Sequence, residues 1–91
     1  MHSKNKPAQT KAEREWVAIL AQLPCVVCDA AGPSEVHEPE QGLWFSAMPL
    51  CPDCHRHPIR GWHGARQGWS ARKMTELKAI NKGVKMALET Q

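Results

Sequence analysis

The sequence contains no long apolar run, and this absence limits where the protein is expected to work. No stretch approaches the roughly 20 apolar residues that a transmembrane helix needs. The N-terminal residues 1–6 carry positive charge, but no apolar stretch follows them as it would in a signal peptide. We therefore expect a protein that is not exported and that works in the cytoplasm.

The chain is also too short to build a large core. Its 91 residues allow one small domain, which buries only about 60–65% of the surface that the unfolded chain exposes. Domains of this size usually need disulfides, a metal ion or a partner subunit for stability. Because the cytoplasm keeps thiols reduced, we interpret the four cysteines as metal ligands rather than as two disulfides.

Positive charge is missing from the middle of the chain. Residues 25–54 contain no Lys or Arg and have a net charge of −5, whereas residues 1–24 carry +2 and residues 55–91 carry +6. An acidic centre suits cations, and a basic C-terminal third suits phosphates. Solvated helix faces are often basic as well, so charge alone leaves both interpretations open.

The pattern along the chain predicts two terminal helices around a small hairpin. Residues 1–9 are expected to form a disordered basic tail, and residues 10–91 a single domain. A capping box at Thr10 and Glu13 opens a helix over about residues 11–23. Strands are expected over residues 35–38 and 43–50. A helical turn then starts near Pro52, and the last helix is expected to begin at Arg66 or Ser70 and to end at Leu88.

Two Cys-x-x-Cys pairs are the strongest chemical signal. Cys25 and Cys28 form the first pair, and Cys51 and Cys54 form the second after a gap of 22 residues. Such pairs complete a tetrahedron of thiolates around one zinc ion, which supplies several kcal/mol of folding free energy. A redox dithiol needs only one pair in a thioredoxin-like context, and the spacing is also compatible with an iron–sulfur cluster.

The order of knuckle, hairpin and helix around these cysteines matches a treble-clef zinc site. We therefore predict a small α+β zinc-binding domain with an N-terminal and a C-terminal helix. Because such a scaffold serves many functions, the function must come from residues that do not bind the zinc. Four histidines lie near this framework and suit proton transfer or metal binding: His37, His55, His57 and His63.

These histidines carry a resemblance to a known family. The order Cys-x-x-Cys, His37-Glu38, Cys51-x-x-Cys54-His55 and His63-Gly64 resembles the HNH (ββα-metal) endonucleases. Residues 16–28 and 48–64 look most like the recombination-enhancement nucleases of phages, whose activity depends on the recombinase RecA. The resemblance covers about residues 14–75. It implies a ββα-metal core and a phage- or prophage-encoded enzyme that hydrolyses DNA phosphodiester bonds in the bacterial cytoplasm.

The resemblance also implies catalytic roles. His37 would activate water as the general base, and Glu38 with His63 would hold a magnesium or manganese ion on the scissile phosphate. Ser46 falls near the position where the family often has an Asn that orients the base. If the register instead places the base at Glu38, that carboxylate would take over the role. Alternation along an extended strand would put Glu38 and Glu40 opposite His37.

DNA is the partner that the resemblance implies, together with a recombinase or replication protein. Trp44 or Trp62 would stack on an unpaired base, or else cover the zinc core. The expected contacts to the DNA backbone are His55, Arg56, Arg60, Arg66, Arg72 and Lys73.

Three functions remain open from the sequence. The first is the HNH-type endonuclease. The second is a non-catalytic zinc module that binds nucleic acid, which the His37-Glu38 pair and Ser46 favour. The third is a small adaptor that binds another protein through the amphipathic last helix.

Overall fold

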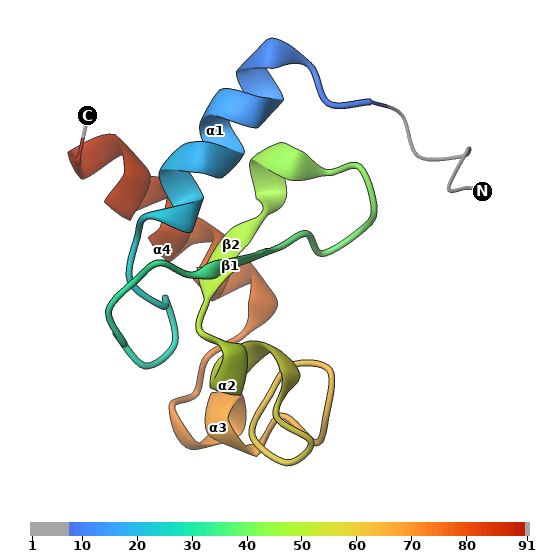
Figure 1. Cartoon of the computed structure of the whole chain (residues 1–91). Coiled ribbons are helices and arrows are strands. Elements are labelled where there is room, and N and C mark those ends of the chain that lie inside the picture. Colours follow the sequence, from blue (N-terminus) through green and yellow to red (C-terminus); the bar gives the residue numbers. More distant parts are fainter. Residues whose placement is uncertain (1–7, 91) are drawn as a thin grey trace.

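The computed structural model describes residues 8–90 and confirms the α+β class (Figure 1). The predicted tail over residues 1–9 falls almost entirely outside these residues. In the described chain no helix has the length and apolar character to cross a bilayer. The elements are α1 (Lys11–Ala21), β1 (Glu35–His37), the 3₁₀ helix η1 (Trp44–Ser46), β2 (Met48–Leu50), α2 (Pro52–Arg56), α3 (Gln67–Ala71) and α4 (Glu76–Glu89).

Helix α1 begins at the predicted capping box. The Thr10 hydroxyl accepts the N–H of Glu13 at 3.1 Å, and the Glu13 carboxylate accepts the N–H of Thr10 at 2.7 Å. The helix ends at Ala21, slightly before the predicted boundary, and Gln22 caps it. Leu20 is buried on its inner face.

The hairpin is shorter than predicted. Strands β1 and β2 pair antiparallel, with Glu35 opposite Leu50 and His37 opposite Met48. The prediction of a strand over residues 43–50 is wrong for its first half, which forms η1. Local turn bonds replace the ladder there, because the N–H of Ser46 donates to Leu43 and the N–H of Ala47 donates to Trp44.

The last helix is broken in two, so the prediction of one helix from residue 66 or 70 to residue 88 is wrong. Helix α3 ends before Lys73, whose φ of 52° is left-handed and cannot continue a right-handed helix. The N–H of Met74 bonds back to the carbonyl of Trp69 at 2.9 Å. A new helix then starts at Thr75, whose hydroxyl accepts the N–H of Lys78.

The hairpin lies between α1 at one end and α2 with α3 at the other (Figure 1). Helix α4 packs against β2, where the N–H of Val26 also donates to the carbonyl of Pro49 at 3.1 Å. This bond places the first cysteine pair beside the second. The main buried cluster gathers around these cysteines and comprises Cys25, Val26, Val27, Met48, Leu50, Cys54, Trp69 and Ala79.

Candidate metal centres

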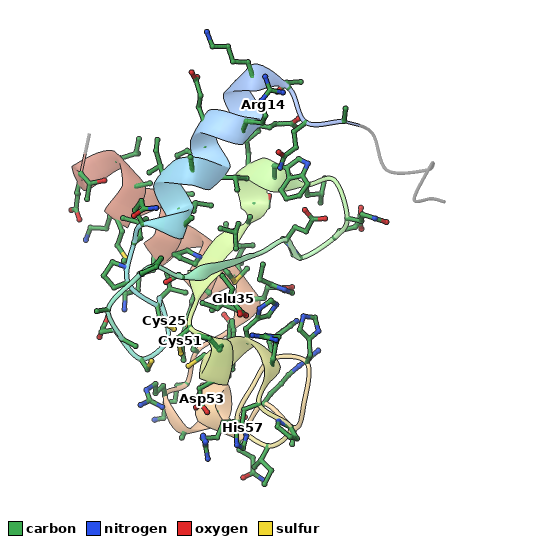
Figure 2. All side chains as sticks on the ribbon, viewed as in Figure 1. Arg14, Cys25, Glu35, Cys51, Asp53 and His57 are labelled. Carbon is green, nitrogen blue, oxygen red and sulfur yellow. The ribbon has the colours of Figure 1, made fainter. Side chains whose placement is uncertain are left out.

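The four cysteines come together as the spacing predicts. Cys25 and Cys28 lie in the turn after α1, Cys51 caps the N-terminus of α2, and Cys54 lies within that helix. Their four sulfur atoms lie within 4.8 Å of one another. In the sequence Cys25 precedes the hairpin and Cys51 follows it. Figure 2 labels both residues, which lie beside α2.

The sulfur geometry fits a tetrahedral ion. The Sγ atoms of Cys28 and Cys51 are 3.7 Å apart. Two thiolates bound about 2.3 Å from one tetrahedral zinc lie roughly 3.8 Å apart. The group can therefore hold a metal ion such as zinc.

The surroundings of the sulfur atoms favour negative charge on at least one of them. The N–H groups of Val27 and Cys54 point at the sulfur atoms of Cys25 and Cys51, each at 3.4 Å. Burial acts to raise the pKa of the Cys25 thiol, but backbone N–H groups outweigh it and lower that pKa. Burial raises the pKa of the Cys51 and Cys54 thiols. A bound cation would stabilise the thiolate form of all four sulfur atoms and so release the protons of the thiols.

A second group consists of three histidines. His37 ends β1 and is only 6% exposed, His55 lies on α2, and His63 lies in the loop that follows. One ring nitrogen of each lies within 4.8 Å of the others. The loop folds back onto α2 because the N–H of His63 donates to the carbonyl of His55 at 3.1 Å, and the N–H of Trp62 donates to that of Cys54 at 2.8 Å. We call these three residues the histidine cluster.

The donor atoms of the histidine cluster also fit an ion. The Nε2 atoms of His55 and His63 are 3.1 Å apart, and two nitrogens bound at about 2.0–2.1 Å to one ion lie roughly 3.0–3.4 Å apart. The Nε2 atom of His37 is buried and makes no well-formed hydrogen bond within the described chain, although an oxygen of Glu76 lies 3.5 Å away. Ring nitrogens suit zinc, nickel, copper or iron, whereas magnesium prefers oxygen ligands.

Two carboxylates border the histidine cluster. Glu35 lies 2.8 Å from Nδ1 of His55, and an oxygen of Glu76, at the start of α4, lies 3.5 Å from Nε2 of His37. Burial and the nearby ring of His55 lower the pKa of His37, and Glu76 opposes this shift. His37 is therefore mostly neutral near pH 7, which is the form that binds metal or accepts a proton.

Glu38 lies outside the histidine cluster. Its Oε1 accepts the N–H of Gly42 at 3.2 Å, which ties the hairpin loop together. The structure thus brings His63 to His37 and His55, and places the carboxylate of Glu38 against the loop instead. Ser46, which was expected near the position of a base-orienting Asn, ends η1.

His55 is the member of the cluster to which the sequence assigned neither a catalytic nor a metal-binding role. It was expected to contact phosphate. The sequence held no signal that pairs it with His63, because the two meet only where the loop after α2 folds back and the N–H of His63 donates to the carbonyl of His55.

The side chains that were predicted to contact phosphate differ in the partners that they have within the protein. Arg56 pairs with Glu35, and Arg60 forms two bonds of 2.8 Å with Asp53. The guanidinium of Arg66 lies 3.6 Å from the centre of the Trp62 ring and donates to the Trp62 carbonyl. Arg72 and Lys73 are exposed around the end of α3.

Trp62 is part of the packing around α3 as well as a surface group. Its ring lies 4.8 Å from that of Trp69, centre to centre. One face of Trp62 therefore covers the core, and the guanidinium of Arg66 covers part of the ring.

Comparison with known proteins identifies no relative. No family model, no curated protein and no solved structure matches the chain. The functional argument therefore depends on the residues and their geometry.

Proposed function

We propose that this chain is a metal-dependent DNA endonuclease of the HNH (ββα-metal) type. The observation that carries the proposal is the meeting of His37, His55 and His63 beside a group of four cysteines. In this proposal the cysteines hold a structural zinc ion in a treble-clef arrangement, and the histidine cluster binds a second ion.

The order of the elements supports this assignment. Two paired strands are followed at once by α2, which is the sequence of elements that the name ββα describes. His37 comes from the first strand and His55 from the helix, so the hairpin and the helix each contribute a ring to one place. His63 joins them from the loop that is hydrogen-bonded to α2.

The residues can be given distinct roles. His55 and His63 would hold the ion through their Nε2 atoms, and neutral His37 would accept the proton of an attacking water at Nε2. The carboxylate of Glu76, 3.5 Å from that nitrogen, would stabilise the imidazolium formed. With an ion held there by His55 and His63, negative charge on the scissile phosphate and on the leaving oxygen would be stabilised.

The metal preference differs from that expected of a site built on Glu38. Magnesium or manganese suited a carboxylate ligand, whereas two or three ring nitrogens favour zinc, nickel, copper or iron. Both classes belong in the assay. Arg66, Arg72 and Lys73 are the proposed phosphate contacts, because Arg56 and Arg60 are already paired with carboxylates.

The phage origin, the cytoplasmic location and a recombinase or replication partner are proposed from the family resemblance alone.

A cleavage assay tests the proposal. Zinc-loaded protein is incubated with single-stranded, duplex and branched DNA and with magnesium, manganese, cobalt or nickel. We expect cleavage with at least one ion, and a loss of about 10²–10⁴-fold in His37→Ala if this residue is the general base. His57→Ala is the matched control, because His57 lies outside the histidine cluster.

Two results would contradict the proposed endonuclease activity. One is the absence of cleavage under every condition, and the other is unchanged cleavage in a His37→Ala, His63→Ala double variant. DNA affinity that falls steeply with salt, without cleavage, would instead support the non-catalytic module.

A further inference from the structure

Glu35 is a half-buried contact point between the hairpin and α2. It lies two residues before His37 on β1, so both side chains project from the same face of the strand. That face meets α2, where Oε1 of Glu35 lies 2.8 Å from Nδ1 of His55. In Figure 2 the labelled Glu35 lies at the point where the hairpin and α2 meet.

Arg56 holds the Glu35 carboxylate in place. Its Nε–H donates to Oε1 at 2.9 Å, and an Nη2–H donates to Oε2 at 2.5 Å. Such a two-pronged bond fixes the orientation of a carboxylate more firmly than a single bond does. Arg56, which was expected to bind phosphate, thus has a partner within the protein.

The contact between Glu35 and His55 determines which nitrogen of His55 carries the proton. A carboxylate can only accept hydrogen bonds, so Nδ1 of His55 must be the donor. In a neutral imidazole the other nitrogen then carries a lone pair. That nitrogen is Nε2, which lies 3.1 Å from Nε2 of His63.

We infer that Glu35 is a positioning residue for the histidine cluster, which fixes the His55 tautomer so that the Nε2 lone pair faces a divalent transition ion. Carboxylates that bond to the second nitrogen of a metal-binding histidine orient the ring and make it a better ligand. The inference rests on the proposed function only in requiring that the cluster binds an ion. It requires no DNA cleavage.

Cobalt(II) titration of the zinc-loaded protein tests this role. The absorption of cobalt bound by nitrogen ligands, without a thiolate charge-transfer band, reports on the histidine cluster separately from the cysteines. We expect Glu35→Ala to weaken cobalt binding about 10- to 100-fold. Glu35→Gln should lose less, because an amide oxygen still accepts a bond from Nδ1. Glu40→Ala, which removes an exposed carboxylate of the hairpin loop, should bind cobalt like the unchanged protein.

The tautomer can also be measured without any substitution. Nitrogen-15 chemical shifts of the zinc-loaded protein should show His55 protonated at Nδ1, and circular dichroism should show whether Glu35→Ala is folded. A His55 protonated at Nε2 would overturn the inference, and so would cobalt binding that Glu35→Ala weakens no more than Glu40→Ala does. If Glu35→Ala does not fold, the nitrogen-15 shifts of His55 in the unsubstituted protein test the inference on their own. The protein could bind cobalt in a way that depends on Glu35 and yet cut no DNA. That result would contradict the proposed endonuclease activity and would still support this inference.

Discussion

At the scale of single residues, two indole nitrogens are buried in different surroundings. The Nε1–H of Trp69 donates to the carbonyl of Cys54 at 2.8 Å, which links α3 to the helix that holds the second cysteine pair. The Nε1 of Trp16 is buried without a hydrogen-bond partner in the described chain. A Trp→Phe substitution can therefore be compared at one site where the indole N–H has a hydrogen bond and at another where it has none.

We predict that Trp69→Phe is the more destabilising of the two changes. Trp69 is 1% exposed, so the smaller ring leaves a cavity and the Cys54 carbonyl loses one donor. Together these effects should lower the free energy of unfolding by about 2–3 kcal/mol. Trp16→Phe removes an N–H that was buried without a partner and should cost about 1 kcal/mol or less. Urea denaturation of the zinc-loaded proteins measures both, and equal losses would contradict the importance of the Cys54 bond.

A second prediction separates His63 from His57. His63→Ala removes one nitrogen from the histidine cluster and should abolish binding of a second divalent ion while one zinc per chain is retained. His57→Ala should keep both ions, because the Nδ1 of His57 instead accepts the N–H groups of Ile59 and Arg60 within a turn. Metal analysis after dialysis checks this. Identical stoichiometry in the two variants would mean that the cluster is not a metal site.

The sequence predicted some of these residues and not others for a physical reason. The cysteine pairs could be predicted because a two-residue gap restricts both sulfur atoms to one neighbourhood, whatever the rest of the fold does. The partners of His55 could not, because Glu35 is 20 residues away and reaches it only through the pairing of β1 with β2. For the same reason the pairing of Arg56 with Glu35 was not foreseen.

At the scale of elements, α4 depends on one glycine for its position. Gly83 is buried where α4 faces β2, and a Cβ there would lie 3.3 Å from Cδ of Pro49 and 3.7 Å from Val26. A glycine inside a helix weakens it relative to alanine. The structure shows that it also allows the helix to approach the strand closely.

We therefore predict opposing effects at Gly83. Gly83→Ala should change stability by less than about 1 kcal/mol, since the gain in helix propensity is offset by a tight contact. Gly83→Val adds bulk that has no room and should cost about 2–3 kcal/mol. Asn81→Ala, at an exposed position of the same helix, should be slightly stabilising. Thermal melts of the three variants give the order, and a stabilising Gly83→Val would contradict close packing here.

The two wrong element predictions also have physical causes. The sequence predicted a strand across Trp44 and Phe45, but local turn bonds form η1, where the ring of Phe45 lies 6.2 Å from that of Trp16. A continuous apolar stripe predicted one C-terminal helix. Thr75 is a good N-cap that starts a separate helix, and the packing of Trp69 on Cys54 directs α3 away from α4.

At the scale of the whole molecule, the cysteine group lies at the centre of the larger core. Two of its members, Cys25 and Cys54, belong to the main buried cluster, whereas the second cluster comprises only Leu20, Leu23, Ala47 and Ala87. So small a second cluster cannot offset the entropy of ordering the chain by itself. Most of the stability is therefore expected to depend on the cysteine site.

We predict that removing the metal unfolds the domain. The binding free energy of a structural zinc, about 10–16 kcal/mol, is at least as large as the stability of a typical small protein. A strong zinc chelator should therefore abolish the helical circular dichroism signal at 25 °C, and added zinc should restore it. Chelator already saturated with zinc is the control. A folded spectrum in protein shown by metal analysis to contain no zinc would contradict this dependence.

The spacing of residues within helix α2 limits which insertions and deletions the protein can tolerate. Cys54 and His55 are consecutive residues, yet one faces the cysteine group and the other the histidine cluster. Each residue added to a helix turns the following side chains by about 100°. One residue inserted between them would keep Cys51 and Cys54 in place but rotate His55 away from Glu35. Within α2, the spacing of the chain is therefore as strict a requirement as the identity of its side chains.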